Sequence, residues 1–200
     1  MNILELLKND EKHLVQYLHL PEDTVLFRED DRCESIGIVI TGEVSIRSYL
    51  PDGSIVTYNT LKDDEIFGNN LVFSSEPFYK GDIIAQKDTD AALIRKEDLL
   101  YLLTHNEAFL LEYMRIQSNF GKSLNNRIRL LSMSSAEERF FFHLHENHNQ
   151  LTFRSISDLA GILYLERETL SRLLSRLEKE HKIIRSGKTI KLYNSSNKEV

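Results

Sequence analysis

The side chains in this sequence whose types and spacing could do chemistry lie together between residues 166 and 179. Glu168, Arg172 and Arg176 recur at steps of four, so a helix would place them in one row. The start of the same segment also carries Arg167, Thr169 and Ser171. An arginine can bond a guanine edge twice, a carboxylate can accept from cytosine N4, and a hydroxyl can bind a phosphate. The segment therefore predicts either a helix that reads DNA or an ordinary surface helix with an ion pair such as Glu168 to Arg172.

The elements that would position this row are visible on both sides of it. Its opposite face carries an apolar stripe made of Leu170, Leu173, Leu174 and Leu177. The preceding residues 155–163 predict a short helix, which Ser155 or Ser157 can cap and in which Ala160 permits a close helix crossing. Two helices joined by a turn of about three residues form the helix-turn-helix layout.

Two short apolar runs, residues 181–184 and 190–193, follow the second helix and flank Gly187. They predict a hairpin, or wing, that would bring Lys188 and a backbone turn to DNA phosphates.

Residues 152–193 resemble the DNA-binding domain of the Crp/Fnr transcription regulators. The run 168–172 (Glu-Thr-Leu-Ser-Arg) is similar to the recognition motif Glu-Thr-x-Ser-Arg of the Fnr branch, and residues 167–169 match the Arg-Glu-Thr of the Crp branch. Residues 187–190 resemble the family's wing. The resemblance implies base reading of a half-site with a TGA core by Arg167, Glu168, Ser171 and Arg172. It implies phosphate contacts by Ser155, Thr169, Arg176 and Lys188.

The distribution of charge agrees with a DNA-binding C-terminal part, although the net charge is −6. Residues 1–138 hold 14 Lys/Arg against 24 Asp/Glu, a balance of −10, whereas residues 139–200 hold 11 against 7, a balance of +4. The basic excess lies where phosphate neutralisation would need it.

Length and composition exclude several other classes of protein. The chain has 200 residues, 41% of them hydrophobic, which is enough for one large domain or two small ones. No apolar run approaches the roughly 20 residues of a membrane span, and charged residues interrupt the only apolar start, so we expect a cytosolic protein without a signal peptide. Cys33 is the single cysteine, which excludes an internal disulfide and a four-cysteine iron–sulfur cluster.

The first half of the chain predicts many short strands, at residues 24–28, 36–40, 43–49, 54–61 and, in two pieces, 83–95. Evenly spaced short strands favour a jelly roll or barrel. This part resembles the double-stranded β-helix, or β-roll, of the cyclic-nucleotide-binding superfamily. Asp23, Asp30 and Asp64 stand where that family commonly has glycine, and we expect aspartate to tolerate the left-handed turns there.

The segment that resembles the phosphate-binding cassette of this superfamily lacks its key residues. Gly68 remains, but Asn69 replaces the carboxylate that takes the ribose hydroxyl, and Tyr79 falls where the arginine for the cyclic phosphate should be. The remaining candidates in this cassette are Asn70 and Lys80. A cyclic phosphate buried without a cationic fork is costly, so we do not expect cAMP to be the effector. A metal-dependent jelly-roll enzyme needs histidines on inward-facing strands, and residues 20–104 contain none.

A long helix is predicted from residue 106 to residue 131, with an apolar stripe over roughly 39 Å. The expected dimer residues on it are Phe109, Tyr113, Ile116, Phe120, Leu124 and Ile128. Because a small β-roll cannot cover the whole stripe, a partner helix is the simplest cover. A dimer also places two recognition helices in successive major grooves, about 34 Å apart.

Two weaker signals have mainly structural explanations. His143 and His145 point apart on a helix, so we expect them, with His148, to lie at a helix C-terminus rather than to bind a metal. Cys33 has Asp30, Asp31 and Glu34 nearby, which we expect to raise its pKa and to make a thiol sensor unfavourable. No cofactor or catalytic arrangement is indicated, so we do not expect an enzyme.

Together these features predict an α+β chain with a β-roll sensor domain at residues 1–104, a dimerisation helix at 105–132 and a winged helix-turn-helix at 133–200. The predicted function is that of a homodimeric transcription regulator whose partners are a near-palindromic double-stranded DNA operator and RNA polymerase, with an unidentified small-molecule effector. The alternatives are a ligand-binding signalling module that acts through protein contacts, and a metal- or haem-responsive member.

Overall fold

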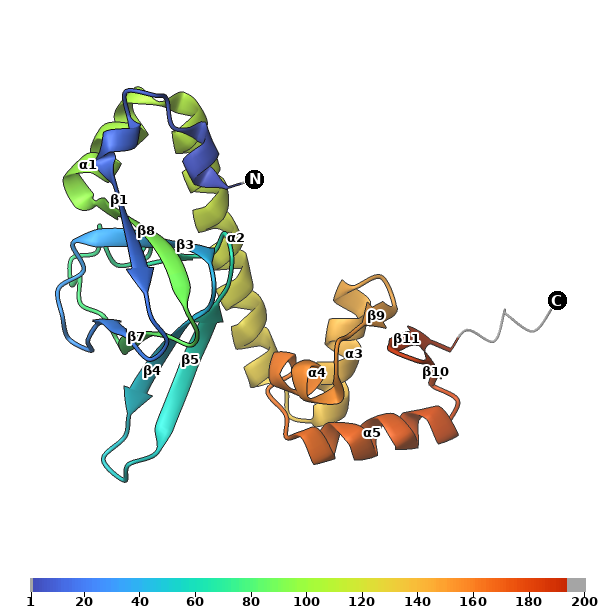
Figure 1. The fold of residues 1–200 in the computed structure, drawn as a ribbon. Coiled ribbons are helices and arrows are strands. Elements are labelled where there is room, and N and C mark those ends of the chain that lie inside the picture. Colours follow the sequence, from blue (N-terminus) through green and yellow to red (C-terminus); the bar gives the residue numbers. More distant parts are fainter. Residues whose placement is uncertain (1, 194–200) are drawn as a thin grey trace. The chain divides into compact units, whose positions relative to one another are not determined.

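The computed structural model describes residues 2–193, and these form two compact units, divided between Asn119 and Phe120. Figure 1 shows strands gathered in the N-terminal unit and short helices in the C-terminal unit. The division falls inside one continuous helix, α2 (Glu107–Ser132), which begins in the first unit and ends in the second. The predicted α+β fold class is confirmed.

Two antiparallel four-stranded sheets build the N-terminal unit, with strand orders β1-β8-β3-β6 and β2-β7-β4-β5. The strands of the first sheet are β1 (Val15–Leu20), β3 (Ser35–Thr41), β6 (Ile66–Phe67) and β8 (Thr89–Arg95). Those of the second are β2 (Val25–Phe27), β4 (Val44–Tyr49), β5 (Ile55–Leu61) and β7 (Asp82–Ala85). The 3-10 helices η1 (Ile3–Leu6) and η2 (Lys12–Leu14) precede them, and helix α1 (Lys96–His105) follows. Strand order jumps between distant parts of the sequence, as in a jelly roll.

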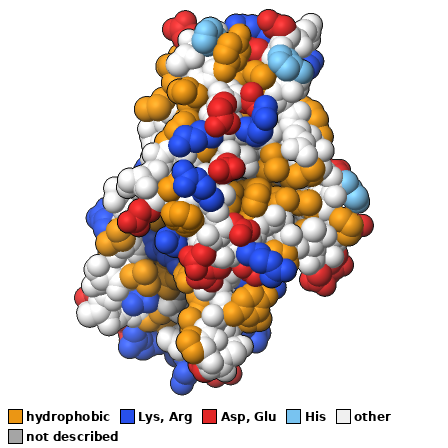
Figure 2. Space-filling model, turned by 90° about the vertical axis from the view of Figure 1, so that its left-hand side faces the viewer, with side chains coloured by type: hydrophobic (Ala, Val, Ile, Leu, Met, Phe, Trp, Pro, Cys, Tyr) orange, Lys and Arg blue, Asp and Glu red, His pale blue; other side chains and the backbone are white. Residues whose placement is uncertain are grey.

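The core of this unit lies between the two sheets. Ile36, Ile38 and Val39 of β3 are fully buried, and so are Ala92 and Ile94 of the neighbouring strand β8. The first sheet is thus held by branched and small side chains that suit a pleated surface. Apolar side chains also reach the surface, for example Tyr49 and Ile55 beside the turn between β4 and β5. Figure 2 shows one face on which acidic and basic side chains are interspersed with apolar ones.

Three aspartates make turns with a left-handed backbone, as the sequence predicted. The φ angles of Asp23, Asp30 and Asp64 are 64°, 67° and 68°. Asp64 lies two residues before β6, and its N–H donates to the carbonyl of Val39 at 2.8 Å. Aspartate tolerates this conformation better than most residues, so the β-roll keeps turns that glycine commonly makes.

Strand β1 and helix α1 are among the elements of the N-terminal unit that were not predicted. Strand β1 is an edge strand in which Val15 and Leu20 alone are buried, so its alternation is weak in the sequence. Helix α1 carries an apolar run around Leu99 and Leu102, which pack into the core, and its period is obscured by the exposed Leu100.

The C-terminal unit packs three helices against a small sheet. Its helices are α3 (Ala136–Glu146), α4 (Ile156–Ile162) and α5 (Arg167–Lys179), and its antiparallel sheet has the order β10-β11-β9. The strands are β9 (Gln150–Thr152), β10 (Ile183–Ser186) and β11 (Thr189–Leu192). A separate core made of Phe140, Leu144, Leu159 and Leu174, among others, holds this unit together. Within residues 2–193 no helix is long and apolar enough to cross a membrane.

Candidate nucleic-acid interface

Helices α4 and α5 form a helix-turn-helix whose turn is fixed by backbone hydrogen bonds. Ser155 caps α4, because its side chain accepts from the N–H of Asp158 at 3.1 Å. The turn contains Tyr164 in a left-handed conformation, with φ 53°. The next N–H, that of Leu165, then donates to the carbonyl of Ala160 at 2.9 Å. These contacts set the angle at which α5 leaves the turn.

Helix α5 buries one face and exposes the other. Its predicted apolar stripe, Leu170, Leu173, Leu174 and Leu177, is buried in the C-terminal core. Ala160 of α4 is also buried, which is consistent with the close helix crossing that its small side chain allows. Since the leucines hold the back of α5, its polar row must face solvent or a ligand.

The four predicted base-reading residues come together on this exposed face. Arg167, Glu168, Ser171 and Arg172 line a shallow hollow of about 320 Å³. The Nε of Arg172 donates to the backbone carbonyl of Glu168 at 3.4 Å, and no ion pair joins the two side chains in the described part of the chain. The ion pair expected of an ordinary surface helix is therefore absent there, which leaves the guanidinium and the carboxylate available to a partner.

The predicted phosphate contacts fall into two groups. Ser155 is an exposed cap whose hydroxyl can still donate, Thr169 is half-buried on α5, and Lys188 is exposed. Arg176 differs, because its guanidinium bonds Glu137 of α3 at 2.6 Å. No pattern in the sequence predicts this pairing, which joins residues 39 positions apart.

A wing follows α5, as predicted. Strands β10 and β11 pair from Ile183 with Leu192 to Ser186 with Thr189, and the turn between them holds Gly187 at φ 58°. A positive φ at the first position of a two-residue turn favours glycine. The wing is extended by β9, which was not predicted, and the N–H of Phe153 donates to the carbonyl of Lys188 at 3.1 Å. Lys188 therefore sits at a turn with an anchored backbone.

In the N-terminal unit, the predicted effector cassette is filled by its own side chains. Tyr79 is buried, and its ring stacks on Phe27 with 4.8 Å between centroids. Its hydroxyl makes no hydrogen bond of normal geometry among the described residues, and burial strongly raises its pKa. Gly68 is also buried against the backbone of Ser35, while Asn70 and Lys80 are exposed. A neutral aromatic ring thus occupies the position at which a cyclic phosphate would need a cation.

Asn69 of the cassette is tied to helix α2. Its side-chain amide donates to Gln117 Oε1 at 2.8 Å, and Gln117 Nε2 donates back to the carbonyl of Asn69 at 2.7 Å. The hydroxyl of Tyr113 donates to the same carbonyl at 3.2 Å. The residue that replaces the ribose-binding carboxylate is therefore already engaged by the protein.

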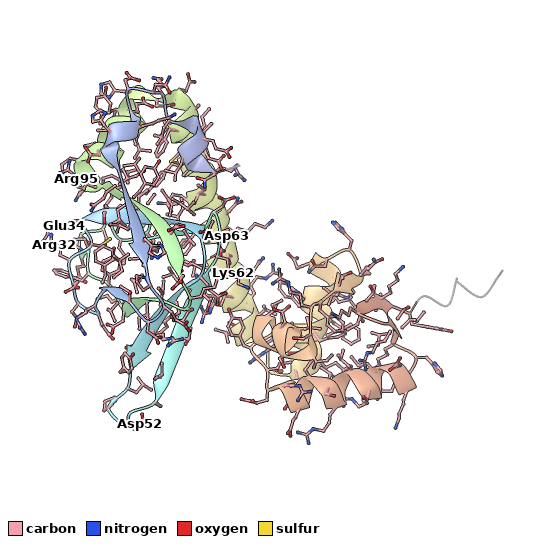
Figure 3. All side chains as sticks on the ribbon, in the orientation of Figure 1. Arg32, Glu34, Asp52, Lys62, Asp63 and Arg95 are labelled. Carbon is pink, nitrogen blue, oxygen red and sulfur yellow. The ribbon has the colours of Figure 1, made fainter. Side chains whose placement is uncertain are left out.

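A cleft of about 500 Å³ opens elsewhere in the N-terminal unit. Arg32, Glu34 and Arg95, which line it, lie at one edge of this unit in Figure 3. Arg32 pairs with Glu34 at 3.6 Å, and Arg95 pairs with Asp98 at 2.9 Å. None of the five cassette residues lines this cleft.

Cys33 lies in the core of the N-terminal unit, and His143 and His145 lie at the end of a helix. The Cys33 thiol is buried and donates to the carbonyl of Ser35 at 3.3 Å. Its pKa is raised, as expected, but burial is the leading cause, so the expected role of neighbouring carboxylates is corrected. His143 and His145 lie in the last turn of α3, and burial lowers the pKa of His143. Within residues 2–193 no group of three or more His, Cys, Asp or Glu side chains could hold a metal ion.

Three of the predicted dimer residues on α2 must be corrected. Phe109 and Tyr113 are 0% and 4% exposed and pack into the core of the N-terminal unit, against which Ile116 also packs. These residues face their own β-roll and are not free to meet a partner helix. Phe120 is half-buried, whereas Leu124 and Ile128 are exposed. The first part of the predicted apolar stripe therefore packs on the β-roll, whereas Leu124 and Ile128 in its second part are exposed.

Known proteins resemble this chain in sequence and in fold. Residues 17–106 match the cyclic nucleotide-binding domain family. The anaerobic regulatory protein of Bacillus subtilis is 25% identical over 184 residues, which cover 86% of this chain and 77% of that protein.

Solved structures extend the likeness to the whole described fold. The catabolite activator protein of Thermus thermophilus is 20% identical, with a TM-score of 0.55 over 97% of this chain and 94% of its own. A variant of CooA from Carboxydothermus hydrogenoformans is 18% identical, with a TM-score of 0.67 over 98% of this chain and 93% of its own. At these identities the structures establish a shared fold.

Proposed function

We propose that this chain is a transcription regulator of the Crp/Fnr type and that it binds a near-palindromic DNA operator as a homodimer. In this proposal residues 1–104 form the sensor domain, residues 105–132 the dimerisation helix and residues 133–200 the DNA-binding domain. The protein acts by binding and not by catalysis, in the cytoplasm, with RNA polymerase as a further partner.

The observation that carries the proposal is the exposed row on α5. Glu168, Ser171 and Arg172 share one hollow, and their helix is fixed from behind by buried leucines. The N-terminal residues of a recognition helix are those that reach base edges in a major groove, and these residues occupy the first two turns of α5. Arg172 would bond a guanine, Glu168 would accept from a cytosine, and Arg167 would add a guanine contact.

The phosphate contacts would come from residues around this row. Ser155, Thr169 and Lys188 would donate to phosphates from the start of α4, from α5 and from the wing. The capped hydroxyl of Ser155 and the anchored turn at Lys188 support these roles, because both hold a donor in place before DNA arrives.

The exposed side of α2 supports a homodimer. Met114, Gly121 and Ile128 follow one another at intervals of seven residues, and Met114 and Ile128 are exposed. Leu124 and Leu131 are also exposed and also lie seven residues apart. Apolar residues at these two interleaved positions form the seam of a two-stranded coiled coil, and a glycine in the seam permits close approach. Ile128 is 61% exposed in the single chain, so a partner helix would bury substantial apolar area. This seam replaces Phe109 and Tyr113 as the proposed contact.

The effector, if the protein has one, is proposed not to be cAMP. The buried ring of Tyr79 and the bonds of Asn69 to α2 support this view, because a cyclic nucleotide would have to displace both. Uncompensated burial of the cyclic phosphate would cost several kcal/mol, since Lys80 offers only a point charge.

The proposal is tested by titrating fluorescent duplexes with the full chain at several salt concentrations. A DNA-binding regulator gives binding that weakens linearly on a log–log salt plot and that is tighter for a duplex with two TGA half-sites than for a scrambled one. A signalling module that acts through protein contacts gives no salt-dependent duplex binding. A metal- or haem-responsive member would in addition show a metal or a Soret band on purification.

A further inference from the structure

Four charged side chains form a cluster near the C-terminal end of α5. They bear on the strength of the proposed DNA binding, on which this inference rests. We propose that Glu137 competes with DNA phosphates for Arg176 and Lys182, and so holds down the affinity of this protein for DNA of any sequence. The cluster, hereafter the carboxylate clamp, comprises Glu137, Arg176, Glu180 and Lys182.

The contacts of the clamp link three parts of the C-terminal unit. Glu137 Oε2 accepts from Arg176 at 2.6 Å, and Glu137 Oε1 accepts from Lys182 at 3.0 Å. Lys182 Nζ also lies 2.9 Å from Glu180 Oε2, and Arg176 Nε lies 3.9 Å from Glu180 Oε1. Each cation therefore faces two carboxylates, and the four charges sum to zero.

Local electrostatics favour the clamp at both of its ends. Glu137 lies in the first turn of α3, where the helix dipole is favourable to a carboxylate. The hydrogen bonds of Lys182 to Glu180 and Glu137 raise the pKa of the ammonium, and its bond to Glu180 lowers the pKa of that carboxyl. These bonds therefore favour the charged forms of Lys182 and Glu180, and with them the closed clamp.

The clamp lies on the surface that the proposed operator would meet. Arg176 shares a hollow of about 490 Å³ with Arg172, Ser175 and Lys179 on the exposed face of α5. Arg176 follows the base-reading Arg172 by one turn of the helix. About half of the Arg176 and Lys182 side chains stays exposed, so both can reach an incoming phosphate if the carboxylates release them.

The energetic balance of the clamp can be estimated. An exposed ion pair stabilises a protein only weakly, so phosphates can compete for its cations. The released carboxylates would then lie beside phosphates, and the repulsion lowers the gain from each new contact. Lys179 and Lys188 have no ion pair within the part of the chain that is described. They remain available to phosphates, and the clamp withholds two further cations.

The test compares Glu137→Gln with Glu138→Gln in the full chain. Both variants remove one negative charge from the same turn of α3, but among the described residues Glu138 accepts from the backbone and hydroxyl of Ser134 alone, at 3.0 Å each. Affinity for an operator duplex and for a scrambled duplex is measured between about 50 and 200 mM salt, the range over which phosphate contacts dominate the change.

The expected result is specific to Glu137. Each added phosphate contact steepens the log–log salt slope by about 0.9, so Glu137→Gln should steepen it by about 2 to 4 for a dimer that gains one or two contacts per protomer. Affinity for both duplexes should rise together, which distinguishes a phosphate effect from a change in base reading. Glu180→Gln should act in the same direction and serves as a second variant. In a chain that also carries Arg176→Gln and Lys182→Gln, the substitution of Glu137 should change the slope no more than that of Glu138.

The outcomes separate this inference from the function on which it rests. If the unmodified chain shows no salt-dependent duplex binding, the proposed function itself fails. If the chain binds duplexes but Glu137→Gln behaves like Glu138→Gln, the competition is refuted. If Glu137→Gln weakens binding, Glu137 positions Arg176 for DNA, and the proposal is also overturned.

Discussion

Replacement of Arg172 by alanine is expected to remove base discrimination while leaving the fold intact. Arg172 is exposed, and its hydrogen bond to the Glu168 carbonyl is long, at 3.4 Å. A surface substitution of this kind changes the free energy of unfolding by no more than about 0.5 kcal/mol. The loss in DNA binding is about 1–3 kcal/mol per half-site, because a bidentate contact to guanine disappears.

For a dimer on two half-sites the loss doubles to about 2–6 kcal/mol, which corresponds to about 30-fold to about 20,000-fold in affinity. Fluorescence anisotropy would compare a duplex with two TGA half-sites and one in which the guanine pair of each half-site is exchanged. The unmodified chain should prefer the first duplex, and Arg172→Ala should bind both with similar affinity.

The matched control is Lys188→Ala, which removes a cation from the wing turn. This variant should weaken both duplexes alike and should reduce the salt slope by about 1 per protomer, since it removes a phosphate contact and no base contact. Equal loss of discrimination in the two variants, or undiminished discrimination in Arg172→Ala, would refute the assignment of these residues.

Three further predictions concern the core, the dimer and the effector. Leu174→Ala, in the fully buried part of the C-terminal core, should lower the free energy of unfolding by about 2–5 kcal/mol in urea titrations followed by circular dichroism, and a loss below about 1 kcal/mol would contradict the packing of α5. Ile128→Glu should shift the chain toward monomer in sedimentation experiments, because it places a charge in the apolar seam. Ser123→Glu, at an exposed neighbouring position, should leave the mass unchanged. Equal masses for the two variants would argue against the seam. Titration calorimetry with cAMP and with cGMP should show no micromolar binding, since Tyr79 fills the cassette, and micromolar binding of either nucleotide would overturn that view.

The C-terminal unit was largely predictable because its signals are local. The leucine stripe, the cap at Ser155 and the glycine of the wing turn each depend on residues within a few positions of one another. The left-handed turns at Asp23, Asp30 and Asp64 were predictable for the same reason, since aspartate in place of glycine is itself informative.

The prediction for α2 was incomplete because one apolar stripe served two surfaces. Phe109 and Tyr113 face the β-roll, while Leu124 and Ile128 face away from any described core residue cluster. Steps of three and four in the sequence do not say which partner each turn of a helix meets. That choice depends on where the strands of the N-terminal unit lie, and their positions come from pairings between distant residues.

Pairings across long sequence separations account for the other differences. Arg176 meets Glu137 from another helix, so a residue predicted to bind phosphate is already engaged by a carboxylate. Asn69 meets Gln117 in the same way, 48 positions along the chain. Cys33 owes its raised pKa mainly to burial, which neighbouring residues in the sequence do not reveal.

Selection of bound duplexes from a random pool by the full chain tests the central proposal most directly. The proposal predicts enrichment of a near-palindrome with TGA half-sites, whose centres lie about one helical turn apart. The same selection with Arg172→Ala should lose the guanine of each half-site. Recovery of unenriched sequences by the unmodified chain, or of a single half-site without its symmetric mate, would contradict the homodimeric DNA-reading function.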